Sequence, residues 1–164
     1  MHDFFEMVYA YRLLLAKEEK LAIPLDADER AELLGLAQLL SGDAPSNDPR
    51  RAMPRVPSPL SVQFTLPGGF GAGQLRNASG GGLAIVTATP GALGERTIVR
   101  VGLVAAGVEY VFPCRVVWVQ KSQQPAMGVV FDGVPSRTSL PGQGGTSWRS
   151  PLRLGARRNA PIAA

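Results

Sequence analysis

The sequence predicts a mainly β protein, in which a six-stranded antiparallel β-barrel follows an α-helical hairpin and precedes a disordered C-terminal tail. Three observations support this fold class. The 164-residue chain contains 19 Gly and 14 Pro but only 18% charged residues, which is typical of a turn-rich β-domain. Helical spacing of apolar residues is confined to residues 1–42. Residues 136–164 are mostly Ser, Gly, Pro and Arg, and a segment with so few apolar residues cannot repay the entropy of folding.

The first predicted helix covers residues 4–20. Its apolar residues recur every three or four positions, and they are Phe4, Val8, Tyr11 and Leu15, with Phe5, Tyr9, Leu13 and Ala16 beside them. This wide aromatic face is expected to pack against the β-domain, and a dimer seam is the alternative use of the same face.

A second helix is predicted after Ile23-Pro24. Asp26 and Glu29 have the spacing of a capping box, and Gly42 stands where a C-cap glycine belongs. Its apolar stripe consists of Leu33, Leu36 and Leu40, backed by Leu34 and Ala37. The short connection predicts an antiparallel helical hairpin over residues 1–42.

Residues 43–59 form a predicted linker, because prolines at 45, 49, 54, 57 and 59 forbid a helix and favour an extended chain. The barrel is expected at 60–135, with candidate strands at 60–66, 73–78, 83–88, 96–104, 107–120 and 126–131. An open sheet of this size would expose its edges, which favours closure. Alternation assigns to the interior Val99, Val101, Leu103, Val117, Val119, Val129 and Phe131. Trp118 and Cys114 are also interpreted as core.

Charge and composition exclude several classes of function. The net charge is +4, but residues 1–42 carry eight acidic and four basic side chains, and the charged residues after Asp132 are five arginines. These spread arginines are few for a nucleic-acid-binding patch, so nucleic acid is not expected as a partner. One Cys and one His do not provide an internal disulfide or the usual ligands of a structural zinc. The sequence lacks the pattern of a signal peptide and a long apolar run, which predicts a cytoplasmic protein.

Two short motifs carry the functional prediction. Arg51 and Arg55 form an Arg-x-x-x-Arg pattern just before the first long strand, with Arg50 as a third candidate. The segment Asn77-Ala78-Ser79-Gly80-Gly81-Gly82 supplies an Asn-x-Ser-x-x-Gly pattern after the second strand. Its glycines would let a ligand approach the backbone, while the amide and hydroxyl offer donors and acceptors. The alternative interpretations are a solvated basic linker and a tight turn.

In this order, and followed by Cys114-Arg115-Val116-Val117-Trp118 and Gly128-Val129-Val130-Phe131, the motifs resemble the PilZ domain over roughly residues 48–134. PilZ is a bacterial family of cyclic di-GMP receptors. The resemblance implies a six-stranded barrel with the arginine arm wrapped over a ligand on its outer face. Carried over by position, Arg51 and Arg55 would hold phosphates and guanine edges, and the opposing surface would comprise Asn77, Ser79, Gly81 and Gly82.

The sequence departs from the family pattern in three places. Asn77 replaces the acidic residue often found there, which removes a charge but keeps an acceptor. The glycine-rich stretch 68–73 predicts an unusually flexible loop before the second strand. The tail lacks the signals of the helix that often follows the barrel, so the N-terminal hairpin is expected to cover that end instead.

The leading functional hypothesis is a non-enzymatic receptor that binds cyclic di-GMP, changes conformation and regulates a partner protein through the helices or a barrel face. No cofactor is expected. The alternative is a PilZ-like protein–protein adaptor that does not bind the nucleotide. An enzyme fits least well, because the acids of 60–132 are only Glu95, Glu109 and Asp132.

Overall fold

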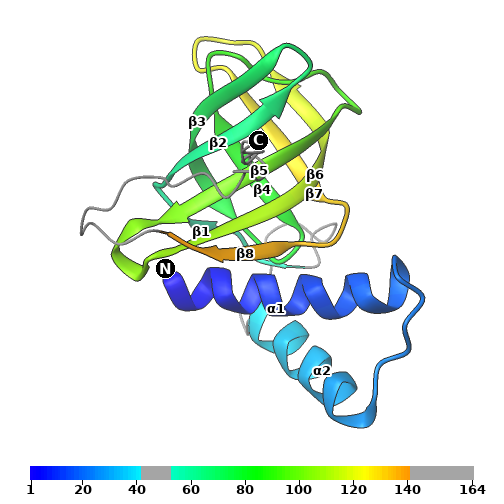
Figure 1. Ribbon diagram of the computed structural model, residues 1–164. Helices are drawn as coiled ribbons and strands as arrows, with labels where there is room; N and C mark the ends of the chain where they lie inside the picture. The colour runs from blue at the N-terminus through cyan, green and yellow to red at the C-terminus, as the bar shows by residue number, and fades with distance from the viewer. Residues whose placement is uncertain (42–52, 141–164) are drawn as a thin grey trace, which may run out of the picture.

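The computed structural model describes residues 1–41 and 53–140. Six antiparallel strands form a closed barrel in the order β3-β2-β5-β6-β7-β4, and β4 pairs with β3 to close it (Figure 1). The strands are β2 (Ser61–Leu66), β3 (Gly69–Ala78), β4 (Gly82–Val86), β5 (Arg96–Leu103), β6 (Val108–Gln120) and β7 (Ala126–Phe131). The predicted barrel is confirmed, and because it is closed, each of its six strands has a neighbouring strand on both sides.

The remaining described elements surround the barrel. They are the helices α1 (His2–Glu19) and α2 (Ala27–Ser41), the two-residue strand β1 (Val56–Pro57), the 3₁₀ helix η1 (Val104–Ala106) and the strand β8 (Ser136–Ser139). β1 pairs with the end of β3, and β8 pairs with the start of β6.

The barrel interior is filled by alternate side chains of its strands, as the period-two pattern predicts. Val99, Val101 and Leu103 of β5 are buried, and so are Tyr110 and Phe112 of β6. Cys114 is buried in the same core, where burial raises the pKa of its thiol, so it is a small apolar core residue and not a reactive thiolate.

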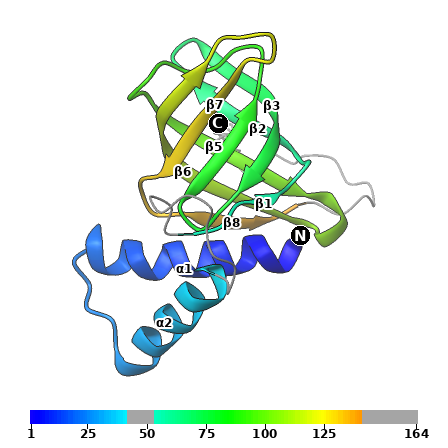
Figure 2. The same ribbon diagram turned by 180° about the vertical axis from the view of Figure 1, so that it is seen from behind.

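Helix α1 lies across one end of the barrel beside β8, as Figures 1 and 2 both show. Phe5 and Val8 are buried in the barrel core, and the ring of Phe5 stacks on Tyr110 with 6.2 Å between centroids. The predicted apolar face of this helix therefore closes the barrel, and the expectation that the helical hairpin covers an end of the barrel is confirmed for α1.

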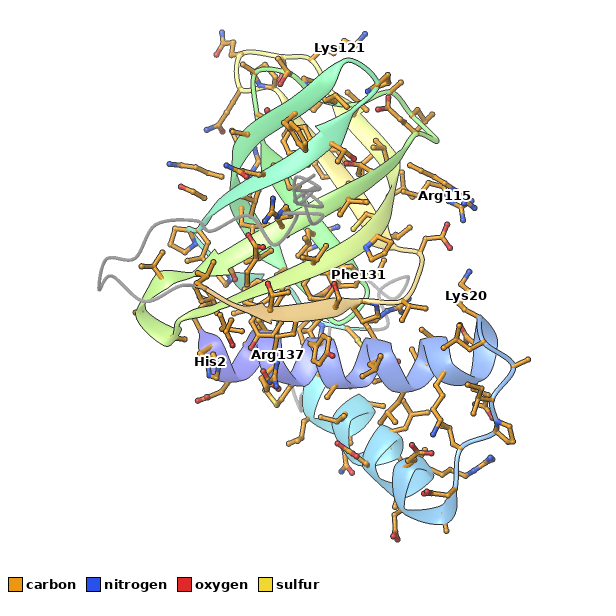
Figure 3. The ribbon with its side chains drawn as sticks, viewed as in Figure 1. His2, Lys20, Arg115, Lys121, Phe131 and Arg137 are labelled. Atoms are coloured by element: carbon orange, nitrogen blue, oxygen red, sulfur yellow. The ribbon has the colours of Figure 1, made fainter. Side chains whose placement is uncertain are left out.

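Polar contacts anchor α1 at both of its ends. Near the N-terminus, Glu6 accepts hydrogen bonds from the Tyr110 hydroxyl and from Arg137 of β8. At the other end, Lys20 donates to Asp132, 2.9 Å away, and Arg115 donates to the second oxygen of that carboxylate. Figure 3 shows Arg137 beside the first half of the helix and Lys20 at its end, near Arg115.

Helix α2 packs on the side of α1 that faces away from the barrel (Figure 1). Its predicted capping box is present, because the Glu29 backbone N–H donates to Asp26 Oδ1 at 2.8 Å and the Asp26 N–H donates to Glu29 Oε2 at 3.1 Å. Only Leu40 is buried, whereas Leu34 and Leu39 are 67% and 66% exposed. The two helices are oblique to one another in both views rather than closely antiparallel. The predicted cap at Gly42 lies outside the described residues.

The prediction that disorder begins at residue 136 is wrong for its first residues. Ser136–Ser139 form β8 and pair with Val108–Val111 of β6. This part of β6 lies beyond its pairing with β7, so its backbone groups needed a partner, and even a polar exposed segment can satisfy them. Residues 141–164 lie outside the described residues.

The prediction of a flexible loop at 68–73 is also wrong. Strand β3 begins at Gly69 and pairs with β2 along this stretch. A Cβ on Gly71 would lie 2.3 Å from the Phe64 ring, and one on Gly73 would lie 2.5 Å from the Val86 carbonyl oxygen. These glycines therefore make room for close packing.

Candidate functional site

A cavity of about 400 Å³ lies on the outer face of the barrel, beside α1. Its wall is formed by the turn between β3 and β4, by the facing parts of β6 and β7, by the segment that leads into β1, and by α1. The cavity therefore brings together residues of α1, of the segment before β1, of the β3–β4 turn, of β6 and of β7.

The turn that joins β3 to β4 forms one side of the cavity. The Ser79 backbone N–H donates to the Gly82 carbonyl at 2.9 Å, and the Ser79 hydroxyl accepts from the Gly81 N–H at 3.3 Å. Asn77, Ser79, Gly81 and Gly82 all line the cavity. The motif thus builds a tight turn and also faces an open space.

Close approach explains the glycines of this turn. A Cβ on Gly82 would lie 2.1 Å from the Val129 carbonyl oxygen, and one on Gly80 would lie 2.2 Å from Met53 Sδ. A Cβ on Gly81 would meet nothing closer than Ser79 Oγ at 3.9 Å. Gly82 is therefore required by β7, whereas Gly81 faces space that a ligand can use.

Two β-bulges orient the polar and aromatic wall residues. The register of β3 and β4 shifts between Leu75 and Asn77, so Leu75 stays in the core while Asn77 faces the cavity. The register of β6 and β7 shifts between Val116 and Trp118, which turns Trp118 to the outer face. Bulges commonly re-aim side chains near functional sites.

Two sequence predictions for this part of β6 are wrong, and the bulge explains the one for Trp118. Trp118 was expected in the core, but it is half-buried and lines the cavity. Val117 was expected to point inward and is instead 44% exposed, as alternation after the buried Cys114 and Val116 requires. Gly128, opposite Trp118, leaves room for the indole, since a Cβ there would lie 1.9 Å from Trp118 Nε1.

Arg55 reaches the cavity from the segment before β1. Val56 pairs with Ala78 and Pro57 with Asn77, so Arg55 directly precedes a strand that is paired with the end of β3. Arg55 lines the same cavity as Asn77 and Ser79. Arg50 and Arg51, the other predicted arginines, lie outside the described residues.

Helix α1 contributes two residues that the sequence analysis did not identify as site residues, Tyr11 and Arg12. Arg12 donates a hydrogen bond of 3.0 Å to the Phe131 carbonyl, and its guanidinium carbon lies 5.7 Å from the centre of the Phe131 ring. The sequence does contain a signal for Arg12. This residue lies four positions after Val8 and four before Ala16, both of which are buried, so its charge lies on the buried face of the helix.

The cavity favours anions. The described wall contains Arg12 and Arg55 and no acidic side chain. Among the described residues, neither arginine has a carboxylate within ion-pair distance. Two positive charges, the polar side chains of Asn77 and Ser79 and an indole ring would suit a ligand that combines anionic oxygens with aromatic rings.

In residues 1–41 and 53–140, no group of three His, Cys, Asp or Glu side chains is placed to hold a metal ion. Neither helix in these ranges is long and apolar enough to span a membrane.

Comparison with known proteins gives one family. The sequence model of the PilZ domain matches residues 49–140, which include every strand of the barrel and the segment that carries Arg55. No similar protein was found among the curated proteins.

Proposed function

The chain belongs to the PilZ domain family, and we propose on that premise that it is a non-enzymatic receptor for cyclic di-GMP. PilZ domains are a family of cyclic di-GMP receptors. The observation that carries the proposal is that Arg55 lines the same anion-favouring cavity as Asn77, Ser79, Gly81 and Gly82.

The chemistry of the ligand matches these side chains. Cyclic di-GMP carries two phosphate charges and two guanines, and each guanine offers an O6 and N7 acceptor pair to a guanidinium fork. In the proposal, Arg51 and Arg55 bind phosphates and guanine edges, with Arg50 as a lesser contact. Asn77, Ser79 and the N–H groups of the turn form the opposite side of the site.

Ligand binding would add contacts that bridge the arginine segment and the barrel. In the proposal these contacts favour one geometry of the protein over another, because a ligand shifts such an equilibrium by its difference in affinity for the two states. We propose that this shift in geometry regulates a protein partner through the helices or a barrel face. The proposed location of the protein is the cytoplasm.

A PilZ adaptor that binds no nucleotide is the second candidate. The observation that favours it is the exposure of Leu34 and Leu39 on α2, since exposed leucines on a helix suit a protein partner. An adaptor of this kind would use the helices without a ligand in the cavity.

Calorimetric titration of the full chain with cyclic di-GMP tests the proposal. We expect saturable heat at concentrations on the order of tens of micromolar. Arg55→Ala should weaken binding about ten- to a hundredfold, because a charge-assisted hydrogen bond is lost, and Ser79→Ala should weaken it less. Arg96→Ala is the matched control, since Arg96 is an exposed arginine of β5 outside the cavity.

Cyclic di-AMP is the matched ligand control. Adenine presents an amino donor where guanine presents O6, so it does not accept the guanidinium fork in the same way. Absence of heat with cyclic di-GMP for the wild-type protein would reject the receptor and leave the adaptor.

A further inference from the structure

We infer that Arg12 of α1 is a further ligand-binding residue, which exchanges its hydrogen bond to the Phe131 carbonyl for an anionic oxygen of the cyclic dinucleotide. This inference rests on the proposed function. It deepens that function, because it makes the N-terminal helix a part of the site and gives the ligand a direct contact with the element on which α2 packs.

The side chain of Arg12 lies at the cavity. Arg12 is half-buried and lines the cavity together with Arg55 and the β3–β4 turn. Arg12 therefore borders the same space as Arg55, the proposed phosphate-binding arginine, from a different element of the fold.

Arg12 has a hydrogen-bond donor that no described residue uses. Arg12 Nη2 donates to the Phe131 carbonyl, but Arg12 Nε is buried and has no hydrogen-bond partner among the described residues. A buried donor without a partner is costly, and no described carboxylate pairs with this half-buried guanidinium. Ligand oxygens would supply both missing partners.

The backbone of Phe131 connects the β3–β4 turn to α1. The Phe131 N–H donates to the Gly81 carbonyl at 3.1 Å, and the carbonyl of the same residue accepts from Arg12. A ligand seated against Gly81 thus contacts a residue that is hydrogen-bonded to Phe131, and Phe131 is in turn bound by Arg12 of α1. The other anchors of α1, at Glu6 and Lys20, engage Tyr110, Arg137 and Asp132, none of which lines the cavity.

Calorimetric titration of full-chain variants tests the inference. Arg12→Met should weaken cyclic di-GMP binding about ten- to a hundredfold. It should also flatten the salt dependence of the dissociation constant between about 50 and about 500 mM salt, because one charge facing the dianion is removed. The control is Glu6→Gln, which weakens an anchor of α1 outside the cavity and should change affinity less than about twofold.

The outcomes separate the two claims. Wild-type affinity in Arg12→Met, or an equal loss in Arg12→Met and Glu6→Gln, would overturn the inference and leave the proposed function intact. No wild-type binding would reject the proposed function, and the inference would fall with it.

Hydrogen exchange on the wild-type protein covers the case in which Arg12→Met does not fold. Saturating cyclic di-GMP should slow amide exchange in the α1 segment around Arg12. Unchanged exchange throughout α1, with slowing at the β3–β4 turn, would contradict the inference.

Discussion

The Tyr110 hydroxyl, on β6 inside one end of the barrel, donates a 2.5 Å hydrogen bond to the Glu6 carboxylate of α1. Tyr110 is fully buried, and Arg137 of β8 donates to the same carboxylate. Burial opposes ionisation of Glu6, but these hydrogen bonds outweigh it and lower its pKa. Helix, barrel and final strand are therefore joined at one ionised carboxylate.

Tyr110→Phe should lower the free energy of unfolding by about 1–2 kcal/mol, because it removes a hydrogen bond to a charged group without changing the packing of the ring. Urea denaturation measures this loss. Tyr9→Phe is the control, since the Tyr9 hydroxyl makes no hydrogen bond to a described residue. Equal losses in the two variants would contradict the assignment.

Asp132 should make stability depend on pH in the acid range. Hydrogen bonds from Lys20 and then Arg115 lower the pKa of its carboxyl from 3.8 to about 2. Because the folded-state pKa is depressed, the stabilisation is present above pH 3.8 and is lost as the pH falls toward about 2. Urea denaturation across this window should show a smaller acid-induced loss for Asp132→Asn than for the wild type.

The control for that series is Asp3→Asn, because the Asp3 side chain is 98% exposed. This variant should follow the wild-type pH profile. An Asp132→Asn profile that coincides with the wild type would show that the contacts of Lys20 and Arg115 do not stabilise the fold.

The glycines of the β3–β4 turn should differ in their tolerance of alanine. Gly82→Ala places a Cβ 2.1 Å from the backbone oxygen of Val129 and should cost about 1–3 kcal/mol of stability. Gly81→Ala meets open space and should stay within about 0.5 kcal/mol of the wild type. Thermal or urea unfolding of the two variants measures the difference. Equal losses of stability would refute the close approach of β4 to β7.

Trp118 should report ligand binding by fluorescence. Its indole lines the cavity, and a guanine base that enters would stack on it and quench its emission. The sequence contains two tryptophans, so the titration is repeated with Trp118→Phe and with Trp148→Phe. Quenching should disappear in the first variant and persist in the second; the reverse pattern would exclude Trp118 from the site.

Much of the fold follows from local patterns. Alternating apolar residues bounded by glycine and proline locate the strands at 96–103 and 126–131 to within one residue. The capping box of Asp26 and Glu29 locates the start of α2. These signals work because they depend on residues close together in the sequence.

The wrong predictions lie where contacts with residues distant in the sequence determine the local structure. β8 forms because an edge of β6 needs hydrogen bonds, and Gly71 is required by the ring of Phe64 rather than by a turn. The bulge before Trp118 depends on the register with β7, so alternation along β6 alone assigns this residue to the wrong face. Tertiary pairing thus overrides local pattern at these positions.

For the site, the motif residues Arg55, Asn77, Ser79, Gly81 and Gly82 could be selected from sequence, and the structure places them around one cavity. Trp118 and the α1 residues Tyr11 and Arg12 could not, because their access to that cavity depends on a bulge and on the docking of a helix. The roles of all these residues toward a ligand remain predictions for the experiments above.

The central claim is tested most directly by mapping the binding of cyclic di-GMP on the isotope-labelled full chain with amide and indole NMR spectra. The proposal predicts saturable shifts that centre on Ser79–Gly82 and on the Trp118 indole N–H, with smaller changes at Lys121 at the far end of the barrel (Figure 3). A spectrum that does not change with excess ligand, or changes confined to residues outside the cavity, would contradict it.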